Sequence, residues 1–285
     1  MSPRLIDTHS HLNFQAFRED ADDVIDRSLE QGTWMINAGT QFETSRKAIE
    51  LAEEYGDGVY AAVGLHPIHL FEHHVDEEET SFNARGEEFN ADSYRDLATR
   101  SIKIVGIGEF GLDYYRMPPG VDPAEVKKVQ EEVVKQHLIL AQEVQKPVMI
   151  HCRDLPRLES GRAGAYDDLF LILKEYYEGP GEIHSFTGTW EQAKKFLSLG
   201  FYVALNGIIT FDKTGRSEEV VKNLPLDMTL RETDAPYLTP VPKRGKRNEP
   251  SYVQCVAEKI AEIKGVEKEE VEKVTTQNAR DLYKI

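Results

Sequence analysis

Short apolar runs alternate with longer amphipathic segments along the whole chain. The short runs have the length and residue content of buried β-strands, and they span residues 5–7, 34–37, 59–63, 104–108, 147–150, 182–183, 202–205 and 229–232. The longer segments repeat apolar residues at helical spacing, as in residues 20–31, 44–55, 124–144, 166–178 and 190–199. Strands that alternate with helices indicate a parallel sheet, and eight of them favour a closed barrel over an open sheet. The pattern therefore predicts an α/β protein with a (β/α)8 TIM-type barrel.

The region after the eighth run predicts additional C-terminal helices, at residues 252–264, 268–276 and 278–283. One barrel of this type accounts for a chain of 285 residues, so we expect residues 1–285 to form a single domain. Two irregular stretches, residues 69–90 and 155–165, follow predicted strands at the same end of the barrel and are expected to frame its mouth. For the acidic first stretch, a solvated insertion without function is the simpler interpretation.

The charge and cysteine content limit the possible partners and compartments. A formal net charge of -16 argues against a protein that coats nucleic acid, although a local cationic patch can still bind a polyanionic substrate. Cys152 and Cys255 are the only cysteines and form no C-x-x-C pair, which excludes a cysteine zinc knuckle and suits a reducing compartment. With no leader-type segment and no apolar run of membrane-spanning length, we expect a cytoplasmic protein without membrane contact.

Polar residues capable of binding metal follow six of the predicted strands. In a barrel of this type the active site lies where the strands end, at the carboxyl end of the barrel. His9 and His11 are two residues apart, so both rings face the same side of a strand. The complete set of candidates at the strand ends is His9, His11, His66, Glu109, His151, His184 and Asp234. Any one histidine is explained as well by core packing, but their joint placement predicts a metal site.

The number of candidate ligands exceeds the three protein ligands of one catalytic zinc ion, and it suits two divalent ions. We expect the two N-terminal histidines and Asp234 to bind one ion, and His151 and His184 to bind the other, with Glu109 shared between them. Paired divalent ions activate water for hydrolysis, and they suit phosphate esters best. Glu109 and Asp234 are therefore the predicted catalytic residues, and Asp234 is the candidate base.

Several residues near this site have the chemistry of substrate contacts. The run at residues 243–247 carries four cations, and arginine and lysine pair phosphate oxygens directly. Tyr114 and Tyr115 could stack on a base, but adjacent strand residues cannot both face the cleft, and we take Tyr114 as the candidate. The predicted substrate contacts are His66, Tyr114, Arg116, Arg153, Arg244, Lys246 and Arg247. Solvent exposure, ion pairing or packing explains several of them equally well.

The chain resembles the TatD family of metal-dependent deoxyribonucleases, within the amidohydrolase-like superfamily. The matching stretches occur in family order over nearly the whole chain: 7–12 (DTHSHL), 63–67 (VGLHP), 108–116 (GEFGLDYYR), 147–154 (PVMIHCRD), 184–188 (HSFTG), 232–238 (ETDAPYL) and 244–250 (RGKRNEP). Phe110 replaces a usual aliphatic residue, and the two irregular stretches are longer than typical. Every candidate ligand position matches, so the differences concern substrate preference.

The resemblance implies exonuclease-like hydrolysis of DNA, on single strands or at ends, supported by two divalent ions that are Mg, Mn or Zn. A metal-dependent ester or amide hydrolase, acting for example on an aminoacyl-tRNA or a small cyclic amide, remains open, as does a non-catalytic binding protein. We expect His69, His73 and His74 at the surface, Cys152 in packing and His137 without a functional role. The oligomeric state is not predicted.

Overall fold

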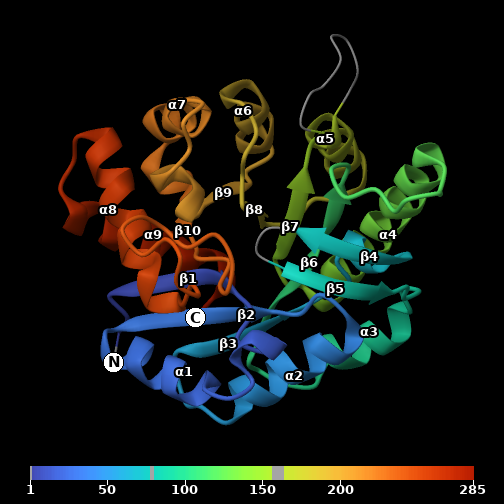
Figure 1. Cartoon of the computed structure of the whole chain (residues 1–285), viewed down its shortest axis with the longest axis horizontal. Coiled ribbons are helices and arrows are strands. Elements are labelled where there is room, and N and C mark those ends of the chain that lie inside the picture. Colours follow the sequence, from blue (N-terminus) through green and yellow to red (C-terminus); the bar gives the residue numbers. More distant parts are fainter. Residues whose placement is uncertain (1, 78–79, 156–163) are drawn as a thin grey trace.

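Eight parallel strands curl into a nearly closed barrel in the computed structural model, which describes residues 2–77, 80–155 and 164–285 (Figure 1). The order around the sheet is β1-β2-β3-β6-β7-β8-β9-β10. These strands are β1 (Leu5–Ser10), β2 (Thr33–Ala38), β3 (Val59–Val63), β6 (Ile104–Asp113), β7 (Val148–Arg153), β8 (Gly181–His184), β9 (Tyr202–Leu205) and β10 (Thr229–Arg231). The predicted TIM-type barrel is therefore confirmed.

The first and last strands meet at the carboxyl end of the barrel. Ser10 pairs with Ala235 in a parallel bridge. The backbone N–H of His11 donates to the carbonyl of Ala235 at 2.8 Å, and the N–H of Asp234 donates to the carbonyl of His9 at 2.9 Å. These bonds bring residues from the two ends of the sequence together in the mouth of the barrel.

The helices surround the barrel (Figure 1). They are α1 (Ala21–Glu30), α2 (Phe42–Glu53), α3 (Ala91–Thr99), α4 (Pro123–Val144), α5 (Ala165–Tyr176), α6 (Trp190–Ser198), α7 (Arg216–Asn223), α8 (Val253–Lys264) and α9 (Lys268–Tyr283). Short 3-10 turns occur at Gln15–Phe17, Pro67–His69, Gly207–Thr210, Leu226–Met228 and Pro250–Tyr252. Helices α3 and α7 were not predicted, and the last two predicted helices are one continuous helix, α9.

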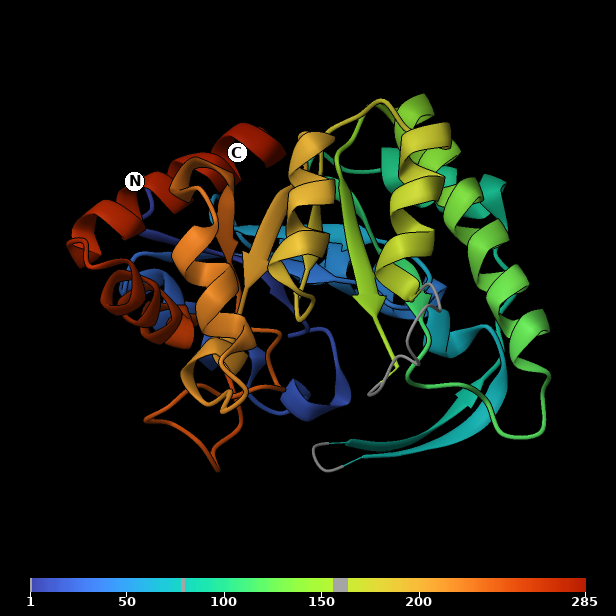
Figure 2. The same cartoon turned by 90° about the horizontal axis from the view of Figure 1, so that it is seen from above.

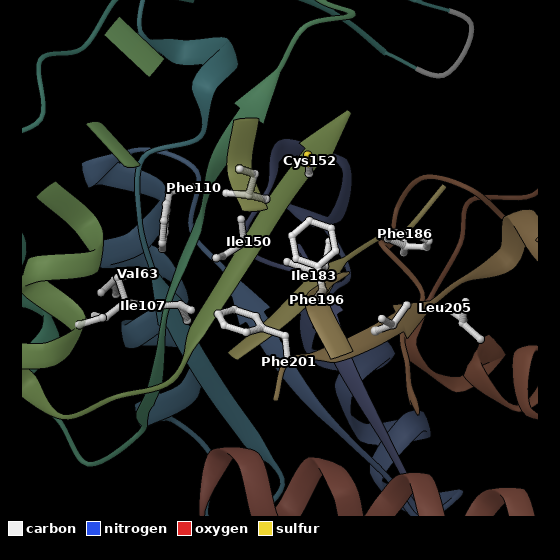
Figure 3. Packing of buried hydrophobic residues seen from close by; sticks show 14 of the residues in the cluster. Val63, Ile107, Phe110, Ile150, Cys152, Ile183, Phe186, Phe196, Phe201 and Leu205 are labelled. Carbon is white, nitrogen blue, oxygen red and sulfur yellow. The ribbon is translucent and has the colours of Figure 1, made fainter. Parts of the chain in front are cut away.

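Apolar side chains fill both faces of the barrel wall. On the outer face, Ile107, Ile150 and Ile183 belong to a large cluster that also contains Phe196 and the expected buried Cys152 (Figure 3). Strand residues that alternate with these form a second, smaller cluster with three residues of α9; its members are Ile6, Ile36, Ala38, Ala62, Val105, Met149, Ala204, Leu230, Ala279, Leu282 and Tyr283. Since its last members come from α9, the C-terminal helix packs against the strand face opposite to the one that contacts the other helices.

Two parts of the acidic stretch at residues 69–90 form strands, contrary to the prediction of an irregular loop. Strands β4 (Glu72–Glu77) and β5 (Thr80–Arg85) pair as an antiparallel hairpin. Figure 2 shows the hairpin on the side toward which β7 points, together with the segment that follows β10. His69 is buried rather than at the surface, with 7% of its area exposed. Residues 156–163, most of the second irregular stretch, lie outside the described residues.

His137, which was expected to have no role, supports the segment just after β3 from helix α4. Its Nδ1–H donates to the carbonyl of Val133 at 2.8 Å, and its Nε2 accepts the backbone N–H of Leu65 at 3.1 Å. The ring lies between Phe89 and Phe110, with centroid distances of 4.0 and 4.4 Å. A neutral imidazole is required for this arrangement, because Nε2 must keep its lone pair.

The neutral state of His137 predicts a pH-dependent contribution to stability. Burial lowers the pKa of His137 to about 3, whereas an unfolded chain takes up this proton near pH 6.5. The contribution is complete above pH 6.5 and decreases as the pH falls toward 3, by up to about 1.4 kcal/mol per pH unit. We expect the free energy of unfolding of His137→Gln to fall less steeply between pH 6.5 and pH 5. Urea denaturation of the chelator-treated parent and variant at several pH values measures how the free energy of unfolding of each depends on pH. Equal slopes for the two proteins would contradict a neutral, buried His137.

Among the helices of the described residues, none has both the length and the apolar character needed to cross a membrane.

Candidate metal centre

Glu109 occupies the middle of a buried cluster of histidines at the carboxyl end of the barrel, and its two carboxylate oxygens face different partners. Oε2 lies 3.4 Å from Nε2 of His9 and 3.8 Å from Nε2 of His11. Oε1 lies 2.9 Å from Nδ1 of His151 and 3.6 Å from Nε2 of His184. The strand ends therefore bring together the residues that the sequence predicted, with Glu109 between two pairs of imidazoles.

Asp234 completes the side of the cluster next to β1. Its Oδ1 lies 3.3 Å from Nε2 of His11 and 3.8 Å from Nε2 of His9. Its backbone adopts a left-handed conformation, with φ of 59°, just after β10. The Asp234 side chain is 16% exposed, compared with 5% for Glu109, so it is the more accessible of the two carboxylates.

Three of the histidines are oriented by an acceptor on the ring nitrogen that points away from the cluster centre. His11 Nδ1 lies 3.0 Å from the carbonyl of Ala38. His184 Nδ1 lies 2.9 Å from Glu232, and His151 Nε2 lies 3.2 Å from Asp113. A proton on each of these outer nitrogens leaves the inner nitrogen with a lone pair, which is the form that binds metal.

The sequence reasoning missed Asp113 and Glu232, the two carboxylates that orient ligands. Both are fully buried, whereas carboxylates are rarely buried without partners. A signal was present in the spacing, because Glu232 lies two residues before Asp234 at the end of the predicted eighth strand. Asp113 lies beyond the predicted strand end, because β6 continues to Asp113, five residues past its predicted end at Gly108.

His66 lies in the cluster but has the opposite proton arrangement. Its Nδ1 accepts the backbone N–H of Ile68 at 3.0 Å, so Nδ1 carries no proton. Burial lowers the pKa of His66 well below its usual value, which keeps the ring neutral. The single proton is therefore on Nε2, which lies 3.4 Å from Oε1 of Glu109. His66 thus presents a hydrogen-bond donor to the cluster, where the ligand histidines present acceptors.

The electrostatics of the cluster favour a bound cation. Burial alone would raise the pKa of Glu109, but His66, His9 and His184 outweigh it and hold that pKa well below its usual value. Burial would lower the pKa of His184, yet Glu232 and Glu109 outweigh it and raise this pKa to about 10. Glu109 thus remains ionised and attracts positive charge. Donor atoms of His9, His11 and Glu109 lie within 4.8 Å of one another, as do those of His9, His184 and Asp234, and this spacing fits a metal ion.

Comparison with known proteins identifies the family. The model of the TatD related DNase family matches residues 6–284. The chain belongs to the TatD family. It is 39% identical over 288 residues to the uncharacterized metal-dependent hydrolase YabD of Bacillus subtilis, and the match covers 99% of both proteins. This TatD-family protein is accordingly a metal-dependent hydrolase, and its buried cluster of histidines and carboxylates is a metal-binding site.

Solved structures agree with this assignment. The crystal structure of YjjV, a TatD homologue from Escherichia coli K12, has a TM-score of 0.81 and 27% identity, and the match covers 100% of both chains. A TatD-family hydrolase from Entamoeba histolytica has a TM-score of 0.78 at 24% identity, with 99% of both chains covered, and it supports the fold alone.

The residues near β6 that were expected to contact substrate differ in their exposure and in their contacts. Tyr114 is fully buried and donates its hydroxyl to Asp168 at 2.9 Å, which does not fit a base-stacking role. Tyr115 is 43% exposed, and the guanidinium of Arg153 lies 3.9 Å from its ring centroid. Arg116 lies 3.8 Å from Asp113, the carboxylate that orients His151. Tyr115 therefore replaces Tyr114 as the accessible aromatic.

The cations of the basic segment are partly engaged within the protein. Arg247 forms an ion pair with Asp20 at 2.5 Å, and Arg244 lies 4.4 Å from the ring centroid of Phe211. Lys246 is exposed, and its backbone carbonyl accepts the hydroxyl of Thr239 at 2.7 Å, which holds the turn. Of the three predicted contacts in this segment, Lys246 fits a phosphate contact best.

Proposed function

We propose that this TatD-family protein hydrolyses phosphodiester bonds in DNA with the help of two divalent ions. The supporting observation is the position of Glu109, whose Oε2 faces His9 and His11 while Oε1 faces His151 and His184. A carboxylate placed in this way can bridge two ions, with Asp234 as a further ligand of the first. The family description, TatD related DNase, supports DNA as the substrate.

The donor set indicates which ions fit. Four imidazole nitrogens with two carboxylates favour Zn or Mn over Mg, because Mg prefers oxygen ligands and keeps several waters. When bound, such ions activate water and neutralise charge on a phosphodiester. His9, His11 and Asp234 would hold one ion, His151 and His184 the other, and Glu109 both.

Asp234 and His66 have complementary roles toward the substrate. Asp234 is the candidate base, because a carboxylate can bind an ion with one oxygen and accept a proton from the attacking water with the other. His66 offers its Nε2–H to a phosphoryl oxygen, and the Ile68 amide on Nδ1 fixes that tautomer. The two residues lie on opposite sides of Glu109, since Asp234 neighbours His11 and His66 faces Oε1.

The surface around the site suits a single strand or a DNA end. Tyr115 offers an exposed ring for stacking on a base, and Arg153, which packs on that ring, offers a guanidinium to phosphate. Arg116 and Lys246 are further candidates for phosphate contacts. Substrate binding would thus combine stacking with local positive charge in a protein whose net charge is -16.

Digestion of end-labelled single-stranded DNA tests the proposal. The chelator-treated protein is assayed alone and after addition of Zn²⁺, Mn²⁺ or Mg²⁺, beside double-stranded DNA and an aminoacyl-tRNA. We expect stepwise shortening of the single strand that requires added metal, with Mn²⁺ or Zn²⁺ more effective than Mg²⁺. Metal-dependent release of the amino acid without cleavage of DNA would instead establish an ester hydrolase.

Lys246→Ala should weaken DNA binding in a salt-dependent way. Loss of one phosphate contact reduces the slope of log affinity against log salt concentration by about 1. Fluorescence anisotropy with a labelled single strand, titrated between low and moderate salt, measures this slope. The control is Lys273→Ala, which removes another exposed lysine, from α9. Identical slopes for Lys246→Ala and the parent protein would exclude the contact.

A further inference from the structure

Glu182 is a buried carboxylate that lies below the proposed metal centre and has no assigned role. It is on β8, two residues before His184, so both side chains face the same side of the strand. The residue is fully buried, and among the described residues neither carboxylate oxygen makes a hydrogen bond of good geometry, although the hydroxyls of Tyr283 and Thr8 lie close to it. A buried carboxylate without a partner is costly, and it therefore requires an explanation.

Among the described residues, His9 lacks an acceptor for its outer ring nitrogen. Its Nε2 faces His11 at 3.0 Å and Glu109 at 3.4 Å, so Nδ1 is the nitrogen that points away from the cluster. Within the described part of the chain this Nδ1 has no hydrogen-bond partner, although it is buried. His11, His151 and His184 each have an acceptor at the corresponding position. His9 alone of the four lacks one.

Two carboxylates, Glu182 and Glu232, lie near His9, and Glu182 is the better candidate to accept its Nδ1 proton. A nitrogen of His9 and one carboxylate oxygen each of Glu182 and Glu232 lie within 4.8 Å of one another. Both oxygens of Glu232 are already used, because Oε2 bonds to His184 Nδ1 at 2.9 Å and Oε1 accepts the N–H of Ser185 at 2.7 Å. Of the two carboxylates, Glu182 is the one whose oxygens make no hydrogen bond of good geometry to the described residues.

We infer that Glu182 is the positioning residue for His9, accepting the Nδ1 proton and thereby directing the Nε2 lone pair toward the metal. The inference rests on the proposed metal centre. It would complete a pattern in which every ligand histidine is held by an outer acceptor, as is usual for metal-binding histidines. Glu182 would act through His9 and contact neither metal nor substrate.

Two substitutions at Glu182 separate this role from simple packing. Glu182→Gln keeps a carbonyl oxygen that can accept the Nδ1 proton, whereas Glu182→Met has similar volume and no strong acceptor. We expect Zn²⁺ affinity to fall about 10- to 100-fold in Glu182→Met and to be largely retained in Glu182→Gln. Thermal stability of the metal-free Glu182→Met protein should be unchanged or increased, since apolar replacements of buried charges are often neutral or stabilising.

Competition with a chromophoric chelator measures Zn²⁺ affinity, and the ¹⁵N chemical shifts of the His9 ring report which nitrogen carries the proton. Tyr283→Phe is the control, because it removes a buried hydroxyl next to Glu182 and keeps the ring. Its affinity should equal that of the parent. Parental affinity in a folded Glu182→Met protein, or an equal loss in Tyr283→Phe, would overturn the inference. Failure of the parent protein to bind Zn²⁺ would instead overturn the proposed metal centre.

Discussion

Glu109→Gln should reduce the rate of DNA hydrolysis by at least about 10³-fold, because in the proposed centre this carboxylate would contribute several kcal/mol of charge stabilisation through both ions. Glutamine has nearly the same shape, so the barrel should remain folded. Its neutral amide cannot replace a carboxylate whose two oxygens face His9 and His151 on opposite sides. We therefore expect the loss of activity to accompany a loss of bound metal, measured by elemental analysis after dialysis.

Glu53→Gln makes the matched control for this experiment, since Glu53 is an exposed residue of α2. Its metal content and activity should equal those of the parent protein. A Glu109→Gln protein that is fully active would disprove the mechanism. A protein that keeps both metals but is inactive would show that Glu109 acts on the substrate, and it would exclude the bridging role.

Asp234→Asn should reduce kcat by about 10²- to 10⁴-fold while retaining much of the bound metal, since general acid–base catalysis contributes an effect of this size. Asp234 is the more exposed carboxylate of the cluster. In the variant, His9, His11 and Glu109 remain as ligands for the first proposed ion. Asparagine keeps a ligand oxygen and loses the ability to accept a proton. Steady-state kinetics on an oligonucleotide, with metal content determined on the same sample, measures both effects.

For the Asp234 experiment, Asp227→Asn changes an exposed residue just before β10 and should leave both quantities unaltered. An Asp234→Asn protein with normal kcat would exclude the residue as the base. Complete loss of metal together with activity would make Asp234 chiefly a ligand, and a different base would then be required.

The barrel and the members of its cluster were predictable because each depends on local patterns. A two-residue spacing places His9 and His11 on one face, and the strand-end rule for barrels locates Glu109 and His184 without knowledge of their contacts. The distances between them depend on how the strands pair. The register shift in β1 between Asp7 and Ser10 is one such feature, and no short segment reveals it.

Other features depend on partners that are distant in the sequence. The tautomer of His66 is set by a turn amide, but the support from His137 requires α4 to pack against the end of β3. The carboxylate of Glu232 meets His184 only when β8 and β10 lie in the same barrel. The hairpin β4–β5 was missed because its strands are rich in polar residues, which a pattern based on apolar runs assigns to loops.

Closure of the barrel by its first and last strands has a consequence for synthesis of the protein. Half of the proposed first ion site comes from His9 and His11, whereas Asp234 follows the eighth strand and is joined to them by the bonds at Ala235 and His9. A chain still on the ribosome whose synthesis has not reached Asp234 cannot assemble the complete centre. A metal-dependent hydrolase with this architecture would be inert while it is being translated, and it would gain its activity only when its two ends have met.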